Sequence, residues 1–358
     1  MRNVRVRLPR AEEPESDFLN LMSSNTAIVD DVQLSARRIF SVIAPELALV
    51  EAELERQARS SVQIIAHLNE YLWSAGGKRV RPALLLLATR AVGGDAARHS
   101  VVRMAAVVEF LHTATLVHDD IIDNAETRRN RASLNRRFGN QIAVLMGDWL
   151  YMSAFETSLA ERSLPILDIL TAVTRKMVEG ELMQLTLLGS ADISEEQYFD
   201  VLERKTAYLF GACCEIGAIL GGATPEQQKA LCDYGMCLGT AFQLIDDLLD
   251  FTGTEEILGK PAGLDLLEGK VTLPIIYLLE SVPQMRRKVQ AVMRSESYAE
   301  ISRAALLRAA EESGALERAR AKAAEFAAAA CAAAEKLPSS IYREALCAIP
   351  NYILERDR

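Results

Sequence analysis

Aromatic residues and cysteines are scarce in this chain of 358 residues. Phe, Trp and Tyr together make up 6% of it, and its six cysteines match neither a zinc-binding pattern nor a small secreted disulfide framework. We therefore expect reduced thiols and a cytoplasmic location. Hydrophobic residues nevertheless make up 50% of the chain and charged residues 25%, which is typical of a globular protein and excludes global disorder.

The chain also lacks an excess of positive charge and a long apolar run. Its 40 Lys and Arg against 49 Asp and Glu give a net charge of -9, which argues against a nucleic-acid partner because phosphate contacts need a basic surface. No stretch approaches the roughly 20 uninterrupted apolar residues of a membrane span. We expect no membrane span, and any anionic ligand must be bound by local cations.

A series of alternating strands is missing as well. Apolar residues recur instead at steps of three and four, as at Ile39, Val42, Ile43 and Leu47. Breaks rich in Gly and Pro leave helices of about 15 to 30 residues, which is typical of a helix bundle. The sequence predicts an all-α fold with one domain over residues 31–358. Residues 1–30 are expected to form a flexible arm, because its arginines precede no apolar secretory segment.

An apolar helix predicted over residues 107–123 ends in three aspartates. Asp119 and Asp123 lie on one face of it, and Asp120 lies about 100° round from Asp119. Negative charge is disfavoured near the C-terminal end of a helix, and like charges four residues apart repel each other. One such cluster leaves two interpretations open, a cation site or a solvated helix end.

The same acidic pattern occurs a second time, and this favours the cation site. Residues 243–250 read QLIDDLLD, with Asp246, Asp247 and Asp250 at the same spacing. Two such helices on opposite walls of a bundle would direct six carboxylates at a shared cavity, which requires hard divalent cations between them. All-oxygen sites completed by a ligand are typical of Mg²⁺ with a diphosphate.

Cations and one histidine flank both acidic motifs. Any one of these cations alone is more simply a solvated surface charge, but together they suit a diphosphate, because Arg offers a bidentate fork and Lys a point charge. His112 lies two turns before Asp119 on nearly the same face and is expected to point into the cavity, whereas His118 is expected to be structural. The flanking cations are Lys78, Arg79, Arg81, Arg128, Arg129, Lys205, Lys260 and Lys270.

Seven segments in this order resemble the trans-polyprenyl diphosphate synthases. They are GGKRVRP (76–82), HTATLVHDDIIDNAETRR (112–129), FGN (138–140), GD (147–148), KTA (205–207), GTAFQLIDDLLDF (239–251) and GKPAGLDLLEGKVTLP (259–274). The likeness is closest to the long-chain bacterial octaprenyl, solanesyl and decaprenyl diphosphate synthases, which make quinone side chains. It implies a homodimer of all-α bundles of the isoprenoid synthase type, each around a deep central cavity, with peripheral membrane contact for product release.

The resemblance also implies roles for individual residues. The Mg²⁺ ligands on the allylic diphosphate, for example farnesyl diphosphate, would be Asp119, Asp120, Asp123 and Asp246, with Asp247 and Asp250 completing the second motif. The same diphosphate would contact Arg128, Lys205, Thr206, Gln243 and Lys260. Isopentenyl diphosphate would lie against Lys78, Arg81, His112 and Arg129, with Gly77 letting the backbone approach. Two departures from the family pattern are Asn130, in place of the usual Gly, and Leu134, in place of a smaller residue.

Two alternatives to this activity remain at this point. A terpene-cyclase-like enzyme of similar fold would ionise the same substrate without adding a second, and the retained GGKRVRP segment and Arg129 argue against it. A non-catalytic subunit of a heteromeric synthase would not need its aspartates, and this chain keeps all six.

The length of the product is predicted from the helix that leads to Asp119. Short-chain members of the family commonly have an aromatic residue one turn before the first aspartate, but here Ala114 and Thr115 are small. Phe110 lies on the far side of the helix. An open tunnel predicts a product of about eight isoprene units, with nine or ten as alternatives, because each helical turn of about 5.4 Å matches about one unit. The other interpretation is that both small residues only permit close helix packing.

Overall fold

A computed structural model describes residues 39–129, 131–253 and 262–355 of the chain. Within these ranges the protein is a bundle of helices, and its only strands are the two-residue pair β1 (Thr127–Arg128) and β2 (Arg131–Ala132). The prediction of an all-α fold is confirmed. The predicted arm over residues 1–30 lies outside the described residues.

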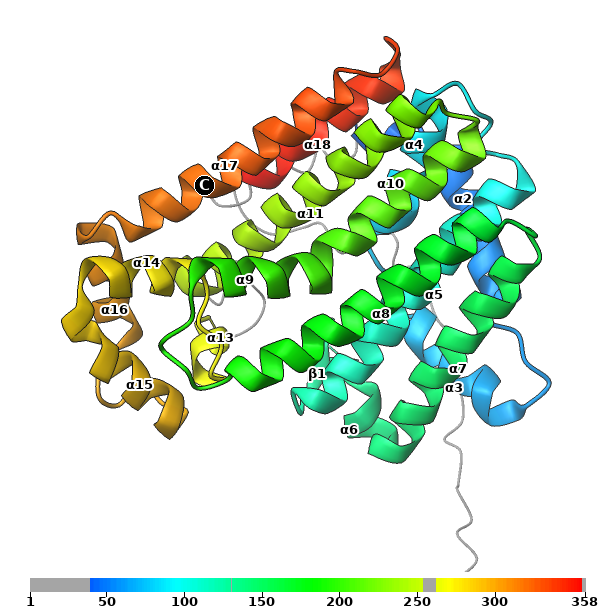
Figure 1. Ribbon diagram of the computed structural model, residues 1–358. Helices are drawn as coiled ribbons and strands as arrows, with labels where there is room; N and C mark the ends of the chain where they lie inside the picture. Colours follow the sequence, from blue (N-terminus) through cyan, green and yellow to red (C-terminus); the bar gives the residue numbers. More distant parts are fainter. Residues whose placement is uncertain (1–38, 130, 254–261, 356–358) are drawn as a thin grey trace, which may run out of the picture.

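Long helices run side by side along most of the molecule (Figure 1). They are α5 (His99–Ile122), α7 (Asn140–Leu159), α8 (Leu164–Leu187), α10 (Tyr208–Gly221), α11 (Pro225–Thr252) and α17 (Ala315–Ala334). Shorter helices complete the bundle: α2 (Ala44–Gln57), α3 (Gln63–Trp73), α4 (Val80–Ala91), α6 (Leu134–Phe138), α9 (Glu195–Leu202), α13 (Leu264–Leu267), α14 (Leu273–Ser281), α15 (Arg286–Ser295), α16 (Arg303–Glu312) and α18 (Ile341–Glu355).

Helix boundaries follow local capping chemistry. Ser194 begins α9 and Thr224 begins α11, each with a side chain that accepts a backbone N–H while a Gln three residues on closes the capping box. Pro225 occupies the first turn of α11, where its missing N–H costs nothing. Gly222 ends α10 in the left-handed conformation that a residue without Cβ adopts most easily.

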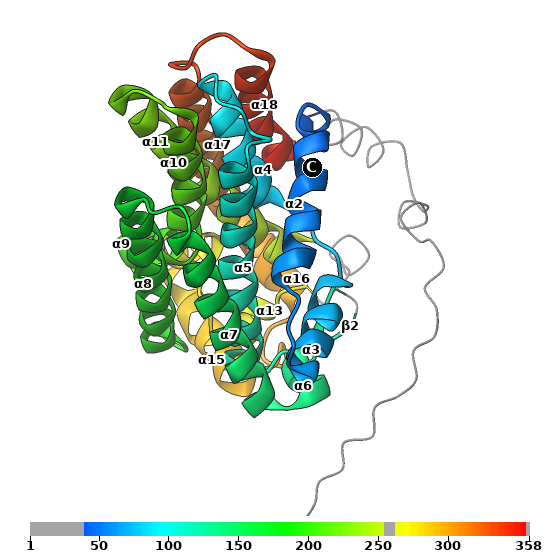
Figure 2. The same ribbon diagram turned by 90° about the vertical axis from the view of Figure 1, so that its right-hand side faces the viewer.

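Helix α5 runs through the middle of the bundle and contacts α2, α4, α7 and α10 (Figure 2). Its length and composition alone would suffice to cross a membrane, but 67% of its most apolar window is buried inside the protein. A core helix of this kind is apolar on most of its circumference because it has neighbours on most sides. The first acidic motif therefore lies at the C-terminal end of a helix whose other turns are largely buried in the bundle.

Two glycines bring the second acidic helix close to its neighbour. A Cβ at Gly235 would lie 2.5 Å from the carbonyl oxygen of Phe210, and one at Gly239 would lie 2.7 Å from the Cα of Ala207. Any larger residue would push α11 away from α10 and from the segment before it. The close approach sets the position of α11, which carries Asp246, against the turn that carries Lys205.

Candidate active site

A cavity of about 450 Å³ lies between α5, α8, α9 and α11 and the segment that follows α13. Asp119 and Asp123 line it from the end of α5, and Asp246 and Asp247 line it from α11. The two acidic motifs therefore share one cavity, as their repetition in the sequence predicts.

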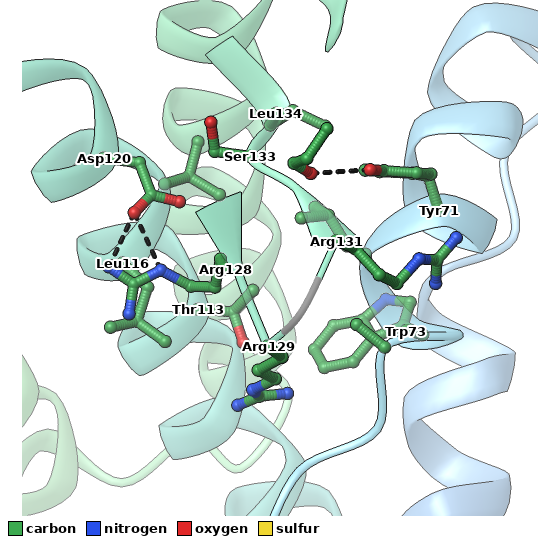
Figure 3. A pocket seen from close by; sticks show the side chains of 14 residues that line it. Tyr71, Trp73, Thr113, Leu116, Asp120, Arg128, Arg129, Arg131, Ser133 and Leu134 are labelled. Atoms are coloured by element: carbon green, nitrogen blue, oxygen red, sulfur yellow. Dashed lines mark hydrogen bonds and ion pairs between the residues drawn. The ribbon is translucent and has the colours of Figure 1, made fainter. Parts of the chain in front are cut away.

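Asp120 points away from this cavity. Its side chain is 4% exposed and forms an ion pair with Arg128 of β1, whose Nε and Nη2 lie 2.7 and 2.6 Å from Oδ1 (Figure 3). The turn of about 100° between Asp119 and Asp120 directs the second carboxylate toward the β1–β2 hairpin. Burial raises the pKa of Asp120, and the bond from Arg128 counteracts this.

The side chain of Asp250 does not line this cavity either. It is 5% exposed, and one of its oxygens accepts the backbone N–H of Asp265 at 3.1 Å. It thereby connects the end of α11 to the start of α13. The prediction that all six carboxylates face the shared cavity was wrong for Asp120 and Asp250, because each forms a local contact that periodicity alone does not reveal.

Asp247 lines the cavity with both of its oxygens engaged. The hydroxyl of Tyr198 donates to Oδ2 at 2.6 Å, and the amide of Gln243 donates to Oδ1 at 2.9 Å. Gln243 in turn accepts the hydroxyl hydrogen of Thr206 at 2.9 Å. The predicted residues Thr206, Gln243 and Asp247 thus form one hydrogen-bonded chain.

Two of the lining carboxylates are unfavourably placed as anions. Burial raises the pKa of Asp119 to about 7, although the nearby charge of Lys205 lowers it. Burial also raises the pKa of Asp247 to about 6, against the hydrogen bonds from Tyr198 and Gln243. A cation bound in the cavity would stabilise both ionised carboxylates.

The donor set fits a divalent cation that shares its ligands with a substrate. The described residues contain no group of three or more His, Cys, Asp or Glu side chains able to hold a metal ion by themselves. Mg²⁺ is commonly bound by one or two carboxylates together with substrate phosphates and water. Carboxylates on two walls of one cavity match that mode better than an all-protein cage.

Lys205 is presented by a π-helical turn, η1 (Glu203–Ala207), that joins α9 to α10. Such turns occur often at functional sites because the extra residue redirects side chains. Nζ of Lys205 lies 2.5 Å from Glu181 and donates to Gln184 at 2.7 Å, both on α8. The predicted Lys205 therefore lines the cavity with its ammonium group held in place.

A second lysine reaches the first acidic motif from across the cavity. Nζ of Lys270 lies 3.2 Å from Asp123 and 2.8 Å from Glu268. Burial would lower the pKa of Lys270, but these two carboxylates outweigh it and raise that pKa. Lys270 is therefore a charged residue at the acidic wall, whereas the predicted Lys260 lies outside the described residues.

Arg81 and His112 line the same cavity, as predicted for the second substrate. Arg81 lies with its guanidinium 5.0 Å from the ring centroid of Phe210, and its buried Nε has no hydrogen-bond partner among the described residues. Burial lowers the pKa of His112 well below the usual value, and the charges of Arg81 and Arg129 lower it further, so its imidazole is neutral. A buried guanidinium with an unsatisfied donor is suited to an anionic ligand.

Arg129 belongs to a smaller pocket of about 50 Å³ on the other side of Asp120. Figure 3 shows Arg128 and Arg129 pointing in different directions from the hairpin, with Trp73 across from Arg129. Lys78 is exposed on the loop between α3 and α4 and lines neither pocket. The structure thus brings Arg81 and His112 together but leaves Lys78 at the periphery.

The cation next to Lys78 has a different environment from the one that the sequence indicates. Arg79 donates to Glu51 at 2.6 Å and to Glu109 at 3.0 Å, and its side chain is 10% exposed. Its charge is therefore balanced within the protein. Grouping Arg79 with the free phosphate-binding cations was wrong, because Glu51 and Glu109 are distant in sequence.

The family of the chain follows from its likeness to known proteins. The model of the family described as Polyprenyl synthetase matches residues 62–309. The chain belongs to the polyprenyl synthetase family. Octaprenyl diphosphate synthase of Escherichia coli (strain K12) is 41% identical to it over 326 residues, which cover 91% of this chain and 100% of that protein.

Solved structures of polyprenyl synthetases superpose on most of the chain. Polyprenyl synthase from Caulobacter crescentus CB15, complexed with calcium and isoprenyl diphosphate, matches with a TM-score of 0.83 and 37% identity over 90% of this chain and 98% of that one. Decaprenyl diphosphate synthase from Rhodobacter capsulatus matches with a TM-score of 0.83 and 35% identity over 90% and 99%. The predicted family and its enzyme class, a prenyltransferase, are confirmed.

The two residues predicted to set the product length of this polyprenyl synthetase have different positions. Thr115 lines the cavity one turn below Asp119. Ala114 is fully buried and does not line it. Ala114 lies four residues before His118, which packs on Gly147 of α7, so both face α7 rather than the cavity. The cavity placement expected for Ala114 was wrong, and the structural role expected for His118 agrees with its contact to Gly147.

Of the two departures from the family pattern, Leu134 lies at the smaller pocket. Leu134 is 2% exposed at the start of α6 and lines that pocket. Asn130 lies outside the described residues. The larger side chain of Leu134 is therefore accommodated in the core.

Several side chains around this synthetase site were not predicted from the sequence. Glu181 and Gln184 lie three residues apart on one face of α8, a spacing that could have indicated a shared partner. Tyr198 and Glu109 carry no such signal, because their partners are distant in sequence. Long-range pairs of this kind are recognised only in the folded chain.

Proposed function

We propose that this protein condenses an allylic diphosphate, such as farnesyl diphosphate, with successive isopentenyl diphosphates. The product is a long-chain all-trans polyprenyl diphosphate of about eight units, by the match between helical turns and isoprene units along α5, and it serves as a quinone side chain. The observation that carries the proposal is the single cavity in which both acidic motifs meet Lys205, Arg81 and His112. Identity along the whole octaprenyl diphosphate synthase of Escherichia coli supports the same product class.

Mg²⁺ is the proposed cofactor, held by the cavity-lining Asp119, Asp123, Asp246 and Asp247 together with the allylic diphosphate. The bound ion supplies charge neutralisation for the leaving diphosphate. Asp120 and Asp250 support these ligands by fixing the hairpin and the start of α13.

The protein's own residues carry the remaining steps. Lys205 and Arg128 line the cavity and stabilise the negative charge that develops on the diphosphate as the allylic C–O bond breaks and its electron pair leaves. The alkene of isopentenyl diphosphate then attacks the allylic cation, and a proton passes to the released diphosphate. Met177 and Leu209 in the apolar wall exclude the water that would trap the cation.

Observations at the second substrate site weigh against the alternatives. The buried, unsatisfied Nε of Arg81 beside the neutral His112 favours a second anionic substrate, which a cyclase-like enzyme would not need. A cavity lined by four carboxylates from both acidic motifs would serve no purpose in a non-catalytic subunit. The test is incorporation of labelled isopentenyl diphosphate with farnesyl diphosphate and Mg²⁺. Incorporation that stops with excess EDTA supports the proposal, and release of hydrocarbon without incorporation contradicts it.

Replacing Arg81 with Met is expected to raise the KM for isopentenyl diphosphate about tenfold or more, because a charge-assisted ground-state contact is lost. His112→Gln should act in the same direction. The KM for farnesyl diphosphate should change little in both variants. Steady-state kinetics with each substrate varied in turn measure this, and a rise confined to the KM for farnesyl diphosphate would show that the two sub-sites are assigned in reverse.

The homodimer is also part of the proposal. Leu145 and Met152 on α7 are 67% and 62% exposed and lie two turns apart, and Val178 and Leu182 on α8 are 50% and 59% exposed. Helices α7 and α8 contact each other, so these stripes lie on neighbouring elements. An apolar surface of this kind is typical of a subunit interface. The cytoplasmic location and peripheral membrane contact remain predictions.

Changing Leu145 and Leu182 together to Glu is expected to convert the dimer to a monomer, because the interface would bury unpaired charges. Light scattering after size-exclusion chromatography measures the mass. Leu49→Glu on α2, 44% exposed, is the control and should remain dimeric. A double variant that stays dimeric would place the interface on another face.

A further inference from the structure

Glu109 on α5 lies among the arginines of the second substrate site and has no role in the steps described above. Its side chain is 4% exposed. It precedes His112 by three residues, so both project from the same side of α5. A carboxylate buried this deeply is tolerated only when cations and hydrogen bonds compensate the lost hydration.

The first of these cations is Arg79, whose guanidinium is held from several directions. Nη1 donates to Glu109 at 3.0 Å, while Nε and Nη2 donate to the two oxygens of Glu51 at 2.6 and 3.1 Å. The group also lies 5.5 Å from the ring centroid of Trp73. The Glu51 side chain is 47% exposed, so the inner contact to Glu109 is the one shielded from water.

The second cation is Arg129, which lies against the same turn as Arg79. A Cβ at Gly77 would be 2.6 Å from Nη1 of Arg79 and 3.0 Å from Nη1 of Arg129. Burial lowers the pKa of Arg129, and so does the charge of Arg79, whereas the charge of Glu109 raises it. Glu109 has the same effect on the buried Arg81. Glu109 therefore pairs directly with Arg79, and its negative charge also favours the charged forms of Arg129 and Arg81.

We propose that Glu109 is a positioning residue for isopentenyl diphosphate, which holds Arg79 in place and keeps Arg129 on the turn at Gly77. This inference rests on the proposed function, in which Arg81 binds that substrate, and on the contact with the same substrate that the family resemblance implies for Arg129. Without the carboxylate, Arg79 and Arg129 repel each other across the turn. Arg129 then moves away from the position in which it contacts the phosphate of isopentenyl diphosphate. A residue that only screened charge would have the opposite effect, since its loss would make the site more attractive to an anion.

The test compares Glu109→Gln with the matched control Glu51→Gln, which removes the exposed partner of the same arginine. Glu109→Gln should raise the KM for isopentenyl diphosphate about tenfold, the effect of losing one buried charged contact, with kcat and the KM for farnesyl diphosphate within about twofold. Glu51→Gln should change each value by less than about twofold, because exposed pairs contribute little. Steady-state incorporation of labelled isopentenyl diphosphate gives all three values.

Several outcomes would overturn the positioning role. These are an unchanged or lowered KM for isopentenyl diphosphate, or an equal rise in both KM values together with a lowered Tm. If Glu109→Gln does not fold, Glu109→Asp is the variant to measure, because it keeps the charge but shortens the reach to Arg79. We expect it to raise the KM for isopentenyl diphosphate alone, by about threefold. An unchanged KM would overturn the role. Absence of incorporation by the unmodified protein would instead overturn the proposed function.

Discussion

Asp119→Asn is expected to lower kcat by about a thousandfold or more, the loss typical of removing an electrostatic group at the reacting centre. Asp119 lines the cavity opposite Asp246, and Asp246→Asn should have a comparable effect. Incorporation of labelled isopentenyl diphosphate measures both losses. Asp233→Asn is the matched control, because Asp233 lies on α11 like Asp246 but pairs with Lys229 at the surface. Full activity in either active-site variant would contradict the metal site.

The same substitution of Asp119 should not destabilise the substrate-free protein. Burial raises the pKa of Asp119 to about 7, above that of the unfolded chain, so the folded state binds more protons between the two values. The contribution of Asp119 to stability is therefore complete at low pH and lost as the pH rises through about 7. At pH 8 the Asn variant should have a Tm equal to or above that of the unmodified protein, and this advantage should disappear at pH 5. A large drop in Tm at pH 8 would show that the charge is stabilising.

Thr115→Tyr is expected to shorten the product to about three or four isoprene units, because the ring would block the cavity about one 5.4 Å turn below Asp119. The first condensation should proceed normally, since the reacting groups are unaffected. Mass spectrometry of the dephosphorylated products measures their length. Thr115→Val has nearly the same volume and should keep the long product. An unchanged length in the Tyr variant would show that the chain follows another path.

Ala114→Tyr is expected to behave differently. Ala114 is fully buried and faces α7, so a ring there overpacks the contact between two helices and lowers stability by about 1 to 3 kcal/mol or more. The length of the product should change less than in Thr115→Tyr. Denaturant unfolding and product analysis together separate the two effects, and a shortened product with unchanged stability would place Ala114 in the tunnel wall.

Periodicity was sufficient to predict the features that depend on a single helix. The helical turn predicts that Asp119 and Asp123 share a face and that His112 points the same way. The second copy of the motif predicts that Asp246 faces the same cavity, and the cavity brings these residues together. The same argument placed Thr115 correctly below Asp119.

Features that depend on a contact between two separate elements could not be predicted in this way. Asp120 turns to Arg128 because the hairpin folds back on α5, and Asp250 binds the N–H that begins α13. Arg79 and Arg81 are two residues apart, yet only Arg79 meets carboxylates within the protein at hydrogen-bond distance. Such differences arise from tertiary packing, which the sequence pattern does not specify.

The most direct test of the account is the mass of the product formed by the unmodified protein from farnesyl diphosphate, isopentenyl diphosphate and Mg²⁺. Polyprenyl diphosphates extending to about eight isoprene units, formed only with the metal ion, are the predicted result. Products that stop after one or two additions, a cyclised hydrocarbon, or no incorporation of isopentenyl diphosphate would contradict it.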